Sequence, residues 1–223
     1  MTAPPPLRLA ILISGRGSNM AAIARACATR TINARVACVG TDRADAAGLD
    51  TARALGIDAF AVLPAAYASR PEFETALAAR LDECRPDLVV LAGFMRILGD
   101  AFVARYRGRM LNIHPSLLPK YKGLHTHRRA LAAGDPMHGC SVHFVTEELD
   151  GGPVVLQGRL RVAPGEDEQR LSARVQALEH IVYPRAIGWI AAGRLAWRDD
   201  RVWLDDKLLT APITEDFDGP ATG

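Results

Sequence analysis

Two polar side chains in an otherwise apolar segment are the first candidates for chemistry. Asn112 and His114 lie two positions apart in the segment Met110–His114. If this segment is a strand, both side chains leave the same face, so an amide donor and a titratable imidazole share one site. Such a pair can stabilise a negatively charged oxygen and move a proton near neutral pH. For His114 alone, the alternative of a histidine hydrogen-bonded within the core stays open.

A carboxylate further along the chain is a candidate partner for this imidazole. Asp150 stands in the turn-like segment 146–153, directly before two glycines and a proline. One interpretation places it near His114, where it would orient the imidazole and stabilise its charged form. A turn alone would also favour Asp at this position, so the sequence leaves both interpretations open.

A glycine-containing loop is the third candidate. The apolar segment Leu7–Ile13 runs into Ser14-Gly15-Arg16-Gly17-Ser18-Asn19 and then into a helix-like segment. Two glycines at such a junction expose backbone N–H groups, and the helix N-terminus directs them at an anion. Met20 stands where a dinucleotide-binding loop has its third glycine, so the pattern indicates a phosphate rather than NAD. The alternative is a plain turn in which Ser18 or Asn19 caps the helix.

These candidates need a scaffold that brings distant segments together. The chain alternates strand-like and helix-like segments, which predicts the α/β class, with an open, mostly parallel twisted sheet and helices on both faces. Several expected strands are apolar throughout, as is typical of strands buried on both faces. The expected strands are Leu7–Ser14, Arg35–Thr41, Ala59–Leu63, Leu88–Ala92, Met110–His114, Ser141–Val145 and Val154–Val162. The expected helices are Asn19–Thr29, Ala44–Leu55, Pro71–Cys84, Ala101–Tyr106 and Thr126–Ala133.

The C-terminal part is less regular. An amphipathic helix is expected over Glu166–Ile181, followed by a break at Pro184 and a shorter helix to Ala192. The segment Leu195–Leu209 has an alternating character that favours a small hairpin. We therefore expect one domain over residues 1–209 and a loose tail over residues 210–223.

Composition narrows the class of protein. The 223-residue chain is 49% hydrophobic and 23% charged, an ordinary globular mix. Its 27 basic and 25 acidic residues leave a net charge of +2, which gives no reason to expect a nucleic-acid or membrane partner. The four cysteines are scattered, which argues against a disulfide framework or structural zinc. With no signal-peptide pattern and no long apolar run, we expect a cytoplasmic protein.

Three ordered motifs together resemble the folate-dependent formyltransferases. They are the run Leu91 to Leu98, the run Asn112 to Pro119 and the run Gly139 to Gly152. The loop Ser14 to Asn19 and the segment Glu179 to Pro184 are similar to one branch of that family, which formylates a glycinamide ribonucleotide in purine synthesis. The resemblance covers about Leu7 to Leu195 and implies a Rossmann-like fold with 10-formyltetrahydrofolate as the co-substrate.

The resemblance also implies roles for single residues. Asn112, His114 and Asp150 match the family's catalytic residues. The nucleotide phosphate would lie on Gly17, Ser18 and Asn19, with Arg70 near the substrate and Glu179 on the glycinamide or ribose groups. The folate would occupy a slot formed by Leu91, Phe94, Met95, Arg96, Ile97, Leu98, Thr146 and Glu147. This arrangement implies a phosphate-binding N-terminal half and a folate-binding C-terminal half. Without the family match, Glu179 could equally lie on a solvated helix face.

Some features stand apart from these roles. His125 and His127 form a His-x-His pair, but no carboxylate stands nearby at ligand spacing, so we expect no metal. Lys122 stands where the family commonly has proline, and Gln176 matches a variable position to which no phosphate contact is assigned.

Other functions stay open at this point. One is a related formyltransferase that acts on an aminoacylated tRNA or a sugar nucleotide, although those relatives carry a further C-terminal domain. Another is a formylfolate hydrolase, and a third is a non-enzymatic nucleotide-binding protein. We expect small-molecule substrates and a monomer or homodimer.

Overall fold

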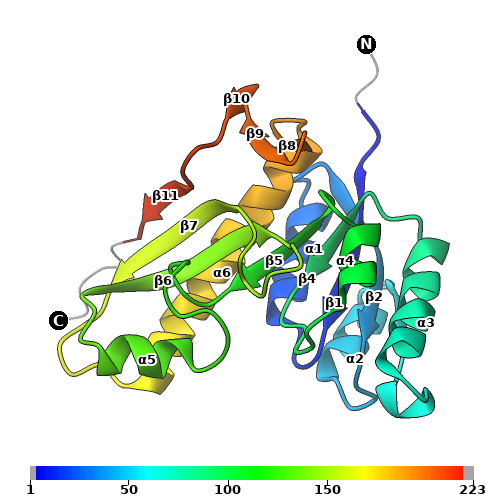
Figure 1. Cartoon of the computed structure of the whole chain (residues 1–223), viewed down its shortest axis with the longest axis horizontal. Coiled ribbons are helices and arrows are strands. Elements are labelled where there is room, and N and C mark those ends of the chain that lie inside the picture. Colours follow the sequence, from blue (N-terminus) through cyan, green and yellow to red (C-terminus); the bar gives the residue numbers. More distant parts are fainter. Residues whose placement is uncertain (1–3, 218–223) are drawn as a thin grey trace.

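The computed structural model describes residues 4–217 and contains one large sheet and one small one. The strands of the large sheet are β1 (Leu7–Ile13), β2 (Ala34–Thr41), β3 (Asp58–Ala61), β4 (Leu88–Leu91), β5 (Met110–His114), β6 (Met137–Phe144), β7 (Val154–Arg161) and β11 (Ile213–Asp216). Their order across the sheet is β11-β7-β6-β5-β4-β1-β2-β3 (Figure 1).

The large sheet is mostly parallel. Strands β3, β2, β1, β4 and β5 all run in the same direction, whereas β6 is antiparallel to both β5 and β7. All four residues of β4 are buried, as expected for a central strand covered on both faces. The predicted α/β class is therefore confirmed, and the carboxyl ends of β1, β4 and β5 meet at one edge of the sheet.

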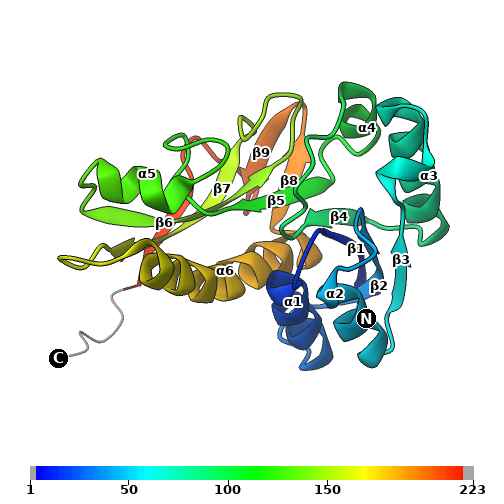
Figure 2. The same cartoon turned by 90° about the horizontal axis from the view of Figure 1, so that it is seen from below.

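Helices cover both faces of this sheet. They are α1 (Ser18–Ala28), α2 (Ala47–Ala54), α3 (Arg70–Glu83), α4 (Asp100–Arg105), α5 (Thr126–Ala132) and α6 (Glu168–Ala191), with a short 3-10 helix at Pro64–Ala66. Figure 2 shows α1 and α6 under one face and α3 and α4 over the other. The core is accordingly divided in two, with Ile23 and Leu178 in one cluster and Phe73 and Phe102 in the other.

The predicted break at Pro184 is wrong. Helix α6 runs without interruption for 24 residues and contains Pro184 in its interior. A proline removes one hydrogen bond and crowds the preceding turn. In α6 this cost is offset because Val182, Tyr183, Ala186 and Ile187 around it are all buried in the core. The hydroxyl of Tyr183 further ties the helix to the sheet, since its one proton is shared between the carbonyl oxygens of Leu91 and Leu111, each 3.0 Å away.

The chain after α6 is more ordered than expected. The predicted hairpin is present as the small antiparallel sheet of β8 (Leu195–Arg198), β9 (Arg201–Leu204) and β10 (Lys207–Leu208). The expected loose tail is wrong for β11, which adds a parallel strand to the edge of β7. Arg159 donates to Asp216 at 2.7 Å, and Phe217 packs against the core. Residues 218–223 of that tail lie outside the described part of the chain.

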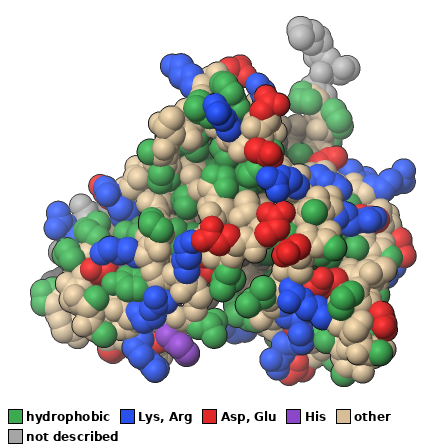
Figure 3. Space-filling view, in the orientation of Figure 1, with side chains coloured by type: hydrophobic (Ala, Val, Ile, Leu, Met, Phe, Trp, Pro, Cys, Tyr) green, Lys and Arg blue, Asp and Glu red, His purple; other side chains and the backbone are tan. Residues whose placement is uncertain are grey.

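The distribution of charged side chains on the surface is consistent with the small net charge of the chain. On the face shown in Figure 3, basic and acidic side chains are interspersed over all the elements in view. All four cysteines are free thiols. Between residues 4 and 217 there is no helix with the length and apolarity needed to cross a membrane.

Candidate active site

The three residues proposed for catalysis converge at the carboxyl end of β5. The Nδ1 atom of His114 lies 3.4 Å from Oδ2 of Asp150, and both side chains are more than nine-tenths buried. The other ring nitrogen of His114, Nε2, donates to the carbonyl oxygen of Tyr121 at 2.9 Å. An imidazole with a proton on each nitrogen therefore has an acceptor for both. This places the carboxylate where the sequence interpretation expected it.

A fourth residue, His143 on β6, completes this cluster. Its Nε2 lies 3.1 Å from Nδ2 of Asn112 and 3.8 Å from Oδ1 of Asp150. Its Nδ1 donates to the carbonyl oxygen of Phe144 at 2.9 Å, so Nε2 is left to accept from the Asn112 amide. Burial lowers the pKa of His143 to about 4, which keeps the ring neutral near pH 7. His143 thereby fixes which end of the Asn112 side chain is the donor.

The role of His143 was not predicted from the sequence, because no partner strand was assigned to the segment Ser141–Val145. Antiparallel pairing of β5 and β6 sets Asn112 directly opposite His143. This pairing register would have identified His143 as a neighbour of Asn112, since directly opposed residues in a sheet share a face.

The backbone at Asp150 explains both interpretations of that residue. Its φ of 48° lies in the left-handed region, which Gly, Asn and Asp adopt most readily. Its Oδ2 also accepts the backbone N–H of Gly123 at 2.9 Å. Asp150 thus suits a turn and also holds the 120–125 loop beside His114.

The glycine loop borders a cavity of about 330 Å³. Gly17, at φ 71°, is the N-cap of α1, and no side chain caps that end, so Ser18 and Asn19 do not act as caps. A Cβ atom at Gly17 would lie 3.1 Å from the Cα of Gly48, which packs α2 against the loop. The first N–H groups of α1 are therefore free to bind an anion.

Asn19 and Glu179 face each other in this cavity. The amide Nδ2 of Asn19 donates to Oε2 of Glu179 at 2.8 Å, and both residues are 8% exposed. Burial raises the pKa of Glu179 to about 7, against the smaller opposing effect of the Asn19 bond. The Oδ1 atom of Asn19 is buried and has no hydrogen-bond partner among the described residues. The solvated-face alternative for Glu179 is therefore wrong.

A polar network fixes the loop that follows β4. Ser14 donates to Oδ1 of Asp42 at 2.6 Å and accepts the backbone N–H of Met95 at 2.9 Å. The other carboxylate oxygen of Asp42 accepts from Nε of Arg96 at 2.7 Å, and its carboxylate is nearly buried. The end of β1 and the 93–98 loop thus share one buried carboxylate.

A second, smaller hollow of about 100 Å³ lies beside the loop that follows β4. Most of the residues expected to form the folate slot line it: Leu91, Phe94, Arg96, Ile97, Leu98, Thr146 and Glu147. Met95 does not, because it faces the phosphate-loop cavity instead. Asn112, His143 and Asp150 also line this slot, so the polar cluster forms part of its wall.

Arg70 is placed differently from the other expected substrate residues. It pairs through Nε with Glu74 at 2.7 Å and lines hollows beside α3, one of them shared with Arg96 and Ile97. It does not line the cavity of the phosphate loop.

The two hollows do not follow the expected division into an N-terminal and a C-terminal half. The phosphate-loop cavity is also lined by His127 and by Ser172, Gln176 and Glu179 of α6, whereas the slot is lined by the 91–98 loop. Gln176, left unassigned from the sequence, is therefore at the cavity wall.

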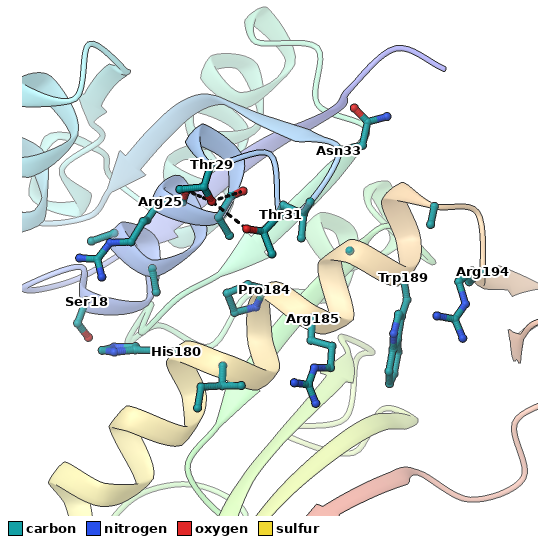
Figure 4. A pocket seen from close by; sticks show the side chains of 17 residues that line it. Ser18, Arg25, Thr29, Thr31, Asn33, His180, Pro184, Arg185, Trp189 and Arg194 are labelled. Atoms are coloured by element: carbon teal, nitrogen blue, oxygen red, sulfur yellow. Dashed lines mark hydrogen bonds between the residues drawn. The ribbon is translucent and has the colours of Figure 1, made fainter. Parts of the chain in front are cut away.

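A larger hollow lies elsewhere in the molecule. A groove of about 890 Å³ runs between α1 and α6, and Figure 4 shows Arg25, His180, Pro184 and Trp189 along it. None of Asn112, His114 and Asp150 lines this groove, so we place the active site at the smaller hollows. Within residues 4–217, no group of three or more His, Cys, Asp or Glu side chains is arranged to hold a metal ion.

Comparison with known proteins gives consistent results. The sequence model of the formyl transferase family matches residues 7–187. The phosphoribosylglycinamide formyltransferase of Escherichia coli (strain K12) is 52% identical over 203 residues, which are 91% of this chain and 96% of that protein. The corresponding protein of Haemophilus influenzae is 43% identical, covering 91% and 95% of the two chains. A structure of the phosphoribosylglycinamide formyltransferase from Coxiella burnetii superposes with a TM-score of 0.89 at 47% identity, covering 94% and 99%.

Proposed function

The chain belongs to the formyl transferase family, and on that premise we propose that its two hollows bind the two substrates of one transfer reaction. The enzyme moves the formyl group of 10-formyltetrahydrofolate to the amine of 5-phosphoribosylglycinamide, a step of purine biosynthesis. The observation that carries this proposal is the position of the Asn112–His143–Asp150–His114 cluster at the carboxyl end of β5. Asn112, His143 and Asp150 line the slot, and the neighbouring residues Ile113 and Pro115 line the phosphate-loop cavity.

The phosphate-loop cavity suits the nucleotide. The uncapped N–H groups at Ser18 and Asn19 offer an anion site at the positive end of the α1 dipole. Glu179 and the unpartnered Oδ1 of Asn19 are acceptors deeper in the cavity, where sugar hydroxyls or an amide N–H can donate. Arg70 acts outside this cavity, from the hollow that it shares with Arg96.

The slot suits the ring end of the folate. Its walls combine apolar side chains such as Leu91, Phe94 and Leu98 with backbone of the 146–150 loop. A flat heterocycle needs this combination of apolar faces and polar edges. The Ser14–Asp42–Arg96 network holds one wall in place before the folate arrives.

The polar cluster supplies the chemistry. When the amine attacks the formyl carbon, negative charge develops on the formyl oxygen, and the Asn112 N–H can stabilise it. Once the amine has attacked, its nitrogen carries a positive charge; His114, paired with Asp150, can take a proton from this nitrogen and pass it to the departing folate nitrogen. Asp150 and His143 keep the two reacting side chains in position.

Further parts of the proposal concern the whole protein. We propose that one catalytic domain extends through β11, to at least Asp216, and that the enzyme works in the cytoplasm as a monomer or homodimer. Its partners are then its small-molecule substrates, with no nucleic acid, no membrane and no metal.

The test is a formyl-transfer assay on the wild type, Asp150→Asn, His114→Ala and the double variant. We expect Asp150→Asn to lower kcat by about a hundredfold or more. The loss of transition-state stabilisation in the double variant should be much smaller than the sum of the losses in the two single variants, as for groups that act as a unit. Asp135→Asn is a matched control, since this carboxylate contacts Lys120 and Tyr121 instead. Normal turnover by a folded Asp150→Asn variant would show that Asp150 only forms the turn and has no part in the reaction.

A further inference from the structure

The phosphate-loop cavity contains a single cationic side chain of the Lys or Arg type. Arg16, between the two glycines of the loop, is the only Lys or Arg among the residues that line this cavity. It is exposed, and no residue in the described range 4–217 forms an ion pair or hydrogen bond with its side chain. By contrast, Arg70 and Arg96 are each tied to a buried carboxylate.

A phosphate bound in this cavity would need a cationic side chain to balance its charge. A phosphate monoester carries between one and two negative charges near pH 7. The α1 N-terminus offers the equivalent of only about half a positive charge. Glu179 adds negative charge once its pKa of about 7 is exceeded, and burial lowers the pKa of His127, which favours the neutral ring. The backbone amides alone therefore leave most of the phosphate charge uncompensated.

A second observation indicates that the cavity is built for a polar ligand. Asn19, which is only 8% exposed, lines the cavity with its Oδ1 atom unpartnered within the described residues. A buried acceptor without a donor is costly, and a ligand with a hydroxyl or N–H group would remove that cost.

We propose that the Arg16 guanidinium pairs with the phosphate of the bound nucleotide and sets the enzyme's preference for a phosphorylated acceptor. This inference rests on the proposed function and adds to it a specificity-determining residue. Guanidinium groups match phosphate in geometry as well as charge, since two N–H groups can bind two oxygens at once. The flanking Gly15 and Gly17 leave Arg16 exposed at the mouth of the cavity.

The test compares two acceptors, the glycinamide ribonucleotide and the same compound without its phosphate. For Arg16→Gln we expect kcat/KM for the ribonucleotide to fall by about ten- to a hundredfold, the range for one charge-assisted contact. Turnover of the dephosphorylated acceptor should change less than about threefold, because it lacks the group that Arg16 contacts. The loss should shrink at high salt, and Arg16→Lys should recover part of it.

The matched control is Arg25→Gln. Arg25 is an exposed arginine of α1 that lines the groove of Figure 4 instead of this cavity, so its loss removes the same charge without the proposed contact. An equal loss for both acceptors, or no loss for either, would overturn the role of Arg16.

Calorimetric binding of the ribonucleotide separates this inference from the proposed function. If the wild type binds it and Arg16→Gln binds it at least about tenfold more weakly, the contact stands even where no formyl transfer occurs. If the wild type transfers formyl groups but the wild type and Arg16→Gln bind the ribonucleotide equally well, the proposed function is supported and the Arg16–phosphate contact is excluded.

Discussion

At the residue scale, the orientation of one amide decides whether the site can stabilise an oxyanion. Asn112 could present either its carbonyl oxygen or its N–H group to the slot. The neutral His143 ring accepts one N–H of Asn112, so the second N–H of the same NH₂ group remains for a ligand. His143 is therefore a positioning residue for Asn112.

Asn112→Ala is expected to remove the oxyanion donor while leaving the other residues that line the slot in place. We predict that kcat falls by about a hundredfold or more, with little change in the binding of either substrate. Steady-state kinetics and calorimetry on the same preparation measure the two effects separately. Retained turnover with weakened binding would identify Asn112 as a binding residue instead.

Glu179 predicts a change of stability with pH. Its pKa of about 7 in the folded protein lies above the ordinary 4.5, so its ionisation destabilises the fold as the pH rises through 7. The penalty is absent below pH 4.5, where folded and unfolded chains are both protonated. Glu179→Gln should therefore raise the free energy of unfolding near pH 8 by about 2–3 kcal/mol and leave it almost unchanged near pH 4.5.

Denaturant unfolding at the two pH values tests this expectation. A gain of the same size at both would show that ionisation of Glu179 is not the cause. The variant should also use the ribonucleotide poorly, because the neutral side chain is a weaker acceptor for the ligand.

The residues of the site could be predicted to different extents. Asn112, His114 and Asp150 lie in sequence patterns that depend on local strand and turn geometry, so their grouping could be anticipated. His143 and Asp42 act through partners far along the chain, and only the pairing of strands brings these partners together. No local pattern carries that information.

At the scale of elements, the turn from β1 into α1 depends on Gly17. Its φ is positive, which strains any residue with a side chain, and a Cβ atom at this position would lie only 3.1 Å from the Cα of Gly48. Gly15 differs, since a Cβ there would meet nothing within 4 Å. The two glycines of the loop thus give a matched pair of variants.

We predict that Gly17→Ala lowers stability by about 1–2 kcal/mol and raises the KM for the ribonucleotide much more than the KM for the folate. Gly15→Ala should leave the fold stability unchanged. Thermal unfolding together with KM values for both substrates checks the prediction. Equal increases in the two KM values for Gly17→Ala would place the phosphate elsewhere.

The elements that differ from expectation share a physical cause. Pro184 disfavours a helix locally, but α6 is held by buried contacts on both sides of it. Strand β11 has mostly exposed residues and no apolar pattern, yet backbone pairing with β7 orders it. In both cases tertiary contacts outweigh the local preference from which the sequence was interpreted.

At the scale of the whole molecule, the site forms where distant parts of the chain meet. The carboxyl ends of β1, β4 and β5 carry the phosphate loop, the 93–98 loop and the Asn112–His114 pair, while α6 brings Glu179 beneath them. The sequence predicted a mostly parallel sheet, and such sheets bind ligands at the carboxyl ends of their strands. It could not predict that the phosphate-loop cavity combines residues from both ends of the chain, because that depends on how α6 packs.

The most direct test of the account follows the formyl carbon itself. The wild-type enzyme is mixed with 10-formyltetrahydrofolate labelled with carbon-13 in the formyl group and with 5-phosphoribosylglycinamide, and the products are analysed by mass spectrometry. We predict that the label appears in the formylated ribonucleotide with equimolar tetrahydrofolate, and that His114→Ala makes this product at least about a hundredfold more slowly. Label recovered as free formate, or left on the folate while the ribonucleotide stays unchanged, would contradict formyl transfer to this acceptor.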